Sequence, residues 1–121
     1  MSRQILEESH IHPAIRDRIS ALNADIVKEV QDAIAANAVV VVGMRQNPMP
    51  KKACKLLDGA GLAYKYLEYG SYLAGWRRRN ALKMWSGWPT LPMVFVKGAL
   101  VGGADDLARL HASGELYKLL A

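Results

Sequence analysis

The sequence predicts an α/β fold with a four-stranded mixed sheet and helices on both faces. Three observations support this prediction. Val39–Val42 is a run of four valines without polar alternation, which is typical of a strand covered on both faces. Segments with the apolar spacing of helices lie on either side of this run. Two further apolar runs flank Lys97-Gly98, which is typical of a hairpin turn.

The first half of the predicted domain contains two helices and two strands. Residues 25–37 have helical spacing, and Asn23 or Asp25 can cap the start of that helix. The valine strand follows, and a helix from about residue 48 to 60 comes after it. Two prolines open this helix, and glycines 59 and 61 mark its end. Residues 64–69 alternate as a second strand should.

The second half adds a helix, a hairpin and a final helix. The sequence predicts a helix over 72–86, rich in Arg and Trp, and then a proline-containing loop over 88–92. Strands at 93–96 and 100–101 form the hairpin. The last helix begins near Ala104, with an interruption near Gly114. The order αβαβαββα joins a parallel βαβ unit to an antiparallel pair, which is the plan of a thioredoxin-like fold.

Composition favours one cytoplasmic domain. The 121 residues suit a single domain, residues 23–121, and residues 1–22 are predicted to be an N-terminal helical extension. We expect no signal peptide and no membrane span. The single cysteine cannot form an internal disulfide. The net charge of +5 suits nucleic acid, anionic lipid or a small acidic ligand, but no nucleic-acid-binding motif and no metal-binding motif is present.

Two motifs resemble the glutaredoxin family, and in particular its monothiol branch. The first is Trp88-Pro89-Thr90-Leu91-Pro92, and the second is Val101-Gly102-Gly103-Ala104-Asp105, after a short hairpin. The similarity extends through Leu110–Leu116. It implies a thioredoxin fold, glutathione as the ligand, and glutathione-dependent disulfide reduction in cell redox homeostasis as the family's activity.

The resemblance also implies a set of glutathione-binding residues. A cis bond before Pro92 leaves the backbone N–H and C=O of Leu91 free to pair with an extended peptide. Free N–H groups where the last helix begins can hold a carboxylate, and an aspartate there can take an ammonium group. Two arginines are expected to face the carboxylates of glutathione. The expected set is Arg45, Arg79, Leu91, Pro92, Gly103, Ala104 and Asp105.

The family's nucleophilic cysteine is absent from this sequence. The active-site tetrad aligns with Asn47-Pro48-Met49-Pro50, so Asn47 stands at the nucleophile position, where it can cap the helix. Cys54 lies further along this helix and is a weak candidate nucleophile, because a buried cysteine usually behaves as a small hydrophobe. Without a thiolate at position 47, we expect no iron–sulfur cluster.

These observations support three interpretations. The first is a glutaredoxin-like protein that binds glutathione or a γ-glutamyl compound without thiol–disulfide catalysis. The second is an active glutathione-dependent oxidoreductase that uses Cys54 or the thiol of a partner. The third is a protein-interaction module whose groove is vestigial. A protein partner fits the first and third interpretations, and neither nucleic acid nor a membrane is the predicted partner.

Overall fold

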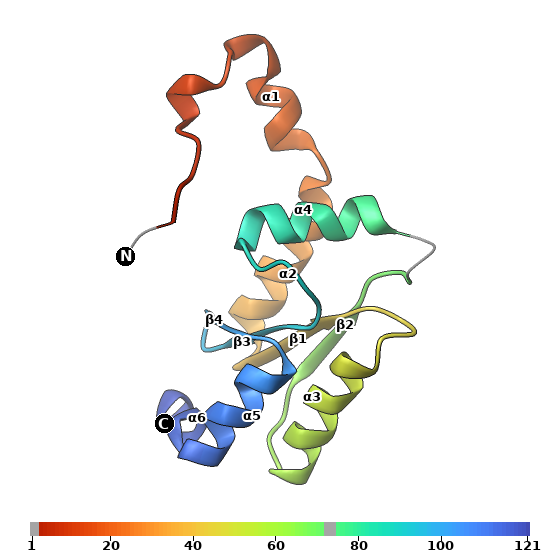
Figure 1. Cartoon of the computed structure of the whole chain (residues 1–121), viewed down its shortest axis with the longest axis vertical. Helices are drawn as coiled ribbons and strands as arrows, with labels where there is room; N and C mark the ends of the chain where they lie inside the picture. Colours follow the sequence, from red (N-terminus) through yellow and green to blue (C-terminus); the bar gives the residue numbers. More distant parts are fainter. Residues whose placement is uncertain (1–2, 72–74) are drawn as a thin grey trace.

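A computed structural model of the chain describes residues 3–71 and 75–121 (Figure 1). In these residues the helices and strands follow one another in the order that the sequence predicts. Their bounds are 3₁₀-helix Glu8–His10, α1 Pro13–Ala21, α2 Ala24–Ala36, β1 Val39–Gly43, α3 Pro48–Gly59, β2 Lys65–Glu68, α4 Trp76–Ser86, β3 Met93–Val96, β4 Ala99–Gly102, α5 Ala104–Ser113 and α6 Glu115–Leu120.

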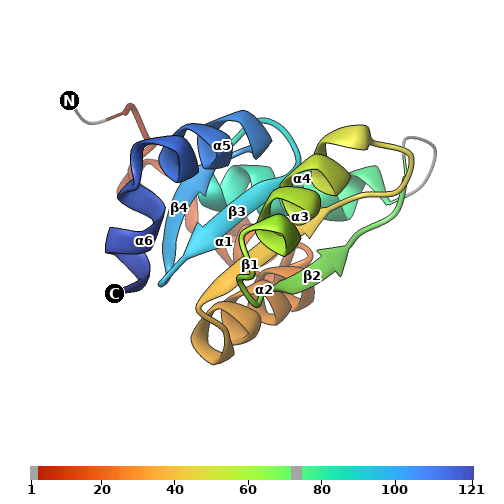
Figure 2. The same cartoon turned by 90° about the horizontal axis from the view of Figure 1, so that it is seen from below.

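The four strands form one mixed sheet in the order β2-β1-β3-β4. β1 pairs with β2 in parallel and with β3 in antiparallel orientation, and the hairpin turn joins β3 to β4. Figures 1 and 2 show α2 and α4 on one face of this sheet and α3 and α5 on the other. The predicted α/β class, with a mixed four-stranded sheet and helices on both faces, is confirmed.

β1 separates two hydrophobic cores. All five of its residues are buried, and the side chains alternate between the two faces of the sheet. Val40 and Val42 pack with the buried residues of α2 and α4. Val39 and Val41 pack with those of α3, α5 and α6. This double burial explains why the valine run has no polar alternation.

The helix boundaries differ slightly from the sequence prediction. The helix predicted over 72–86 corresponds to α4, which begins at Trp76. Its predicted start at Tyr72 lies outside the described residues. Of the two predicted caps of α2, Asn23 occupies the N-cap position but its side chain makes no capping hydrogen bond, and Asp25 lies in the first turn of the helix. The predicted interruption near Gly114 is confirmed, because this glycine has φ of 83° and separates α5 from α6.

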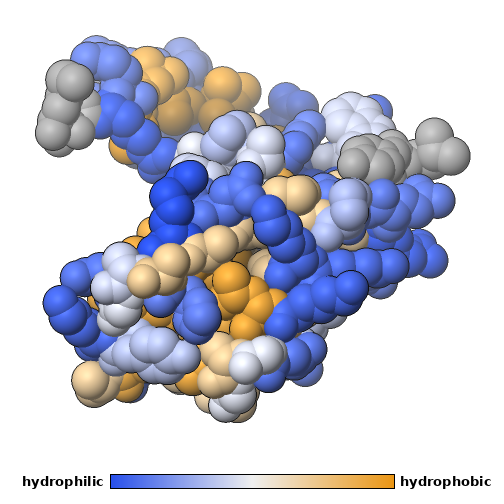
Figure 3. Space-filling model, turned by 60° about the horizontal axis from the view of Figure 1, so that its bottom comes forward, coloured by the Kyte–Doolittle hydropathy of each residue, from blue (hydrophilic) through white to orange (hydrophobic). Residues whose placement is uncertain are grey.

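The N-terminal arm, residues 3–22, extends away from the domain and ends at the turn between α1 and α2. None of its helical residues is buried, and Ile15, Ile19 and Leu22 are exposed. In Figure 3 the arm stands apart from the body and carries hydrophobic side chains on its surface. Arg3 reaches back to the end of α4, where Nη1 lies 3.4 Å from the carbonyl oxygen of Ser86.

In residues 3–71 and 75–121, no helix has both the length and the apolar character that crossing a bilayer requires.

We predict that Gly43→Ala destabilises the domain. A Cβ atom at Gly43 would lie 2.7 Å from Cβ of Pro50 and 2.8 Å from the hydroxyl oxygen of Tyr66. Overpacking of this kind lowers the free energy of unfolding by about 1–3 kcal/mol, as measured by urea denaturation. Gly59→Ala is the control, because a Cβ atom there meets no atom within 4 Å. Equal stabilities of the two variants would contradict the prediction.

Candidate functional site

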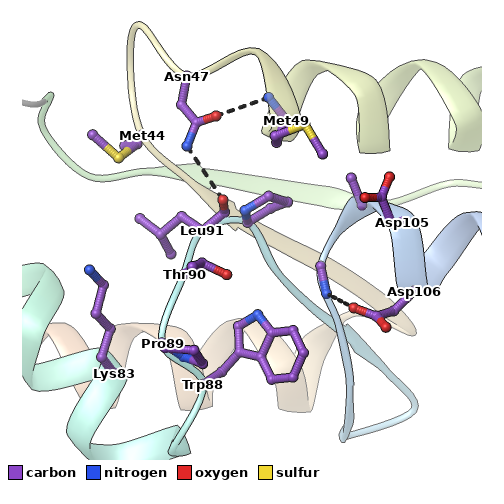
Figure 4. A pocket seen from close by; sticks show the side chains of 13 residues that line it. Met44, Asn47, Met49, Lys83, Trp88, Pro89, Thr90, Leu91, Asp105 and Asp106 are labelled. Atoms are coloured by element: carbon purple, nitrogen blue, oxygen red, sulfur yellow. Dashed lines mark hydrogen bonds between the residues drawn. The ribbon is translucent and has the colours of Figure 1, made fainter.

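The candidate site is a groove of about 450 Å³ at one edge of the sheet (Figure 4). The pairing of Val42 with Met93 brings the loop after β1 next to the loop before β3, and the start of α5 completes the groove. Its lining residues are Met44, Asn47, Met49, Lys83, Trp88, Pro89, Thr90, Leu91, Pro92, Gly103, Ala104, Asp105 and Asp106.

Asn47 connects two walls of the groove. It is the N-cap of α3, where its Oδ1 accepts a hydrogen bond from the Met49 N–H at 3.0 Å. The predicted capping role is therefore confirmed. Its Nδ2 also donates to the carbonyl oxygen of Leu91 at 3.4 Å, which is close to the outer limit for a hydrogen bond. The Asn47 amide thus accepts a hydrogen bond from a backbone N–H of α3 and also contacts the loop before β3, as Figure 4 shows.

The loop that leads into β3 ends at Leu91 and Pro92. The Leu91–Pro92 peptide bond is cis, and both side chains are buried. The prediction that the Leu91 carbonyl is free is wrong, because it accepts the bond from Asn47. A carbonyl oxygen has two lone pairs, so this acceptor can still take a second donor.

The start of α5 is an ordered turn with one exposed acid. The Gly103 N–H donates to Oδ2 of Asp106 at 2.9 Å. This bond, together with Arg109, lowers the pKa of Asp106. Asp105, the preceding residue, is exposed and forms an ion pair with Lys52 of α3, with 2.8 Å between Nζ and Oδ1. The groove therefore has a carboxylate at its rim, and a lysine of the chain already contacts it.

The two predicted arginines do not line the groove. Arg79 is buried, with 5% of its surface exposed, and its Nη1 donates to the carbonyl oxygen of Tyr69 at 3.1 Å. This bond ties α4 to the segment after β2. Arg45 is exposed, and its backbone N–H donates to the Gly70 carbonyl. Lys83 lies one helical turn after Arg79 and supplies the lining cation in its place.

The predicted set of ligand-binding residues did not include the apolar and aromatic lining. Met44 and Met49 flank Asn47, and the indole ring of Trp88 lies across the groove from them (Figure 4). Trp88 belongs to the first motif that resembles the family, whereas the only sequence signal for Met44 and Met49 was their closeness to Asn47. The other expected residues of the set, namely Leu91, Pro92, Gly103, Ala104 and Asp105, all line the groove.

Cys54 lies outside the groove, in the second turn of α3. Its side chain is half-buried and packs against the core that contains α5. Burial raises the pKa of the Cys54 thiol, and a hydrogen bond with Tyr64 opposes this shift only in part. A nucleophilic cysteine needs a lowered pKa, whereas the pKa of Cys54 is raised and its side chain does not line the groove.

Among the described residues, no group of three or more His, Cys, Asp or Glu side chains is placed to hold a metal ion.

Comparisons with known proteins give one consistent result. Residues 39–101 match the family model of glutaredoxins. The chain is 45% identical over 103 residues to a glutaredoxin-like protein of Dictyostelium discoideum, covering 85% of this chain and 84% of that protein. It is 30% identical over 112 residues to the mitochondrial monothiol glutaredoxin-5 of Schizosaccharomyces pombe, covering 88% and 77% of the two proteins.

Solved structures agree with these sequence matches. A buckwheat glutaredoxin, whose crystal structure is a complex with glutathione, superposes with a TM-score of 0.72 at 27% identity. The alignment covers 82% of this chain and 90% of the buckwheat chain. The thioredoxin-like fold is therefore shown by structure as well as by sequence.

We predict that Cys54 reacts slowly with iodoacetamide in the folded protein. Because burial raises its pKa, the folded protein contains less thiolate at any given pH than the unfolded chain. The alkylation rate, followed by mass spectrometry, should be several-fold lower in buffer than in urea. It should also continue to rise above the pH at which the rate in urea levels off. A folded-state rate that levels off at a lower pH than the rate in urea would contradict this prediction.

Proposed function

This chain belongs to the glutaredoxin family, and we propose that it binds glutathione, or another γ-glutamyl compound, without catalysing thiol–disulfide exchange. The observation that carries the proposal is Asn47. It occupies the start of α3 beside the groove, at the position where the family has its nucleophile. The groove is present, but an asparagine amide stands where the family has the sulfur of its nucleophilic cysteine.

An amide at position 47 cannot perform the first step of exchange. In that step a thiolate attacks one sulfur of a disulfide, forms a mixed disulfide and releases the other sulfur as a thiol. The Asn47 side chain has no nucleophilic atom of this kind, and its Nδ2 and Oδ1 are both engaged in hydrogen bonds. For the same reason we propose that position 47 does not hold an iron–sulfur cluster, because cluster iron takes thiolate ligands.

The remaining groups of the groove suit a γ-glutamyl peptide. The second lone pair of the Leu91 carbonyl can accept a backbone N–H from an extended ligand. The first N–H groups of α5 can hold a carboxylate, because the helix N-terminus carries a partial positive charge. Asp105 can hold an ammonium group at the same end of the groove. The glutathione complex of the buckwheat relative supports this assignment of the ligand.

Binding requires the ligand to displace an internal contact. Lys52 already pairs with Asp105, and their side chains are 56% and 61% exposed. An exposed ion pair of this kind contributes about 0–1 kcal/mol, so its loss is a small penalty. The ammonium group of a ligand can therefore replace the Lys52 ammonium at Asp105 without a large change in the fold.

The geometry does not favour catalysis through Cys54. The cysteine does not line the groove, and its raised pKa keeps the thiol protonated near neutral pH.

We predict that glutathione causes saturable amide shifts at Leu91 and Gly103–Asp105 in a two-dimensional NMR titration. Asp105→Ala should weaken binding by about tenfold, because it removes a hydrogen-bonded charge partner of the ligand. Asp32→Ala is the matched control. Asp32 is an exposed aspartate of α2, and it also pairs with a lysine, Lys28.

Two outcomes would count against the proposal. The absence of shifts at millimolar glutathione would show that the groove does not bind this ligand and would favour a protein-interaction role. Equal weakening by Asp105→Ala and Asp32→Ala would show that binding depends on net charge and not on the groove.

A further inference from the structure

Trp88 contains a buried hydrogen-bond donor with no acceptor. Its indole Nε1 is shielded from solvent and has no partner among the residues that the structure describes. Buried donors in folded proteins are almost always paired, so an unpaired one needs an explanation. The same side chain lines the groove, which places the unpaired N–H next to the proposed ligand.

The orientation of the indole is set by its surroundings. The backbone N–H of Trp88 donates to Oγ of Ser86 at 3.1 Å, and that hydroxyl lies 3.5 Å from Sδ of Met93. The ring also packs against the core that contains α2 and α4. In Figure 4 the nitrogen is on the edge of the ring that faces the interior of the groove. The donor is therefore positioned before any ligand arrives.

The indole N–H lies at the start of α5. A Cβ atom built on Gly103 would lie 3.9 Å from Nε1 of Trp88 and 3.6 Å from the carbonyl oxygen of Pro92. The N–H of Gly103 is already used by Asp106 and is not available to a ligand. At the end of the groove formed by the start of α5, the indole N–H is thus the side-chain donor available to an anionic group of a ligand.

We propose that Trp88 is a specificity-determining residue, and that its indole N–H donates to the α-carboxylate of the γ-glutamyl group. This inference rests on the proposed function and identifies the part of the ligand that the groove selects. An α-amino acid head group carries its ammonium and carboxylate on one carbon. When Asp105 holds the ammonium, the carboxylate must lie beside it, where the start of α5 and the indole N–H provide donors.

Selectivity follows from the buried donor. A ligand with an α-carboxylate supplies the missing acceptor of the indole N–H, whereas a ligand that lacks this group leaves the donor buried and unpaired, as it is in the chain alone. Sites built to hydrogen-bond a particular group discriminate strongly against analogues without it. The groove should therefore prefer γ-glutamyl peptides to peptides whose first residue has only an amine.

The experiment follows the indole signals of the ¹⁵N-labelled chain. The sequence contains three tryptophans, so three indole cross-peaks are expected, and Trp88→Phe assigns the signal of interest. On titration with glutathione, the Trp88 indole proton should move downfield and saturate together with the amide of Asp105. The indole signals of Trp76 and Trp85 should stay in place. This titration uses the unmodified chain, so it does not depend on the folding of a variant.

Affinities measured by calorimetry give the second readout. Trp88→Phe should weaken glutathione binding by about tenfold or more, the effect of one lost hydrogen bond to a charged group. It should not change the affinity for 4-aminobutyryl-cysteinyl-glycine, which keeps the amine and lacks the α-carboxylate. Trp85→Phe is the matched control and should leave both affinities unchanged, since the Trp85 ring contacts the ring of Phe95 and does not line the groove.

The possible failures are distinguishable. If the amides of Gly103–Asp105 shift and saturate while the Trp88 indole does not move, glutathione binding stands and the role of Trp88 is overturned. If Trp88→Phe weakens both ligands equally, its contribution is packing, and the carboxylate assignment is overturned. If no signal responds to glutathione, both the proposed function and this inference fail.

Discussion

The position of β1 in the centre of the sheet is the constraint on which the rest of the structure depends. Its four valines are buried against helices on both faces, so the strand can occupy only an interior position. Its pairing with β3 places Val42 opposite Met93. The loop that leads into α3 therefore meets the loop that contains Pro92, and the groove forms where these loops meet the start of α5. The position of the groove therefore depends on the register of β1 and β3 as well as on the residues that line it.

Asn47 shows that the structural and chemical roles of one position can be separated. The start of α3 presents free backbone N–H groups, and a thiolate at that position would be stabilised by them. The amide of Asn47 satisfies one of these donors and also reaches the Leu91 carbonyl. The helix and the loop thus keep their arrangement while the nucleophile is absent. Nearby polar groups are also paired within the chain, Asp105 with Lys52 and Asp106 with the Gly103 N–H. Among the buried side-chain polar atoms of the described residues, the indole N–H of Trp88 is the one without a partner, and for this reason it points to a ligand.

Sequence patterns predicted the fold well, because each pattern reflects a local physical cause. The valine run, the proline-opened helix and the hairpin at Lys97-Gly98 all appear as expected. The site was only partly predictable. Spacing along a helix could not show that Arg79 turns inward to the Tyr69 carbonyl while Lys83 faces the groove. The Lys52–Asp105 pair joins residues 53 positions apart. An unpaired indole N–H can be recognised only when every neighbouring acceptor has been placed.

The most direct test restores the missing nucleophile with Asn47→Cys. The assay follows the mixed disulfide of glutathione and 2-mercaptoethanol, with reduced glutathione as the reductant. The new thiolate attacks the glutathione sulfur and releases 2-mercaptoethanol, and a second glutathione then regenerates the thiol and leaves as oxidised glutathione. We expect the unmodified chain and Cys54→Ser to show the same background rate and Asn47→Cys to exceed it clearly. Turnover by the unmodified chain that Cys54→Ser abolishes would contradict the account. An inactive but folded Asn47→Cys variant would show that the groove does not present glutathione to position 47.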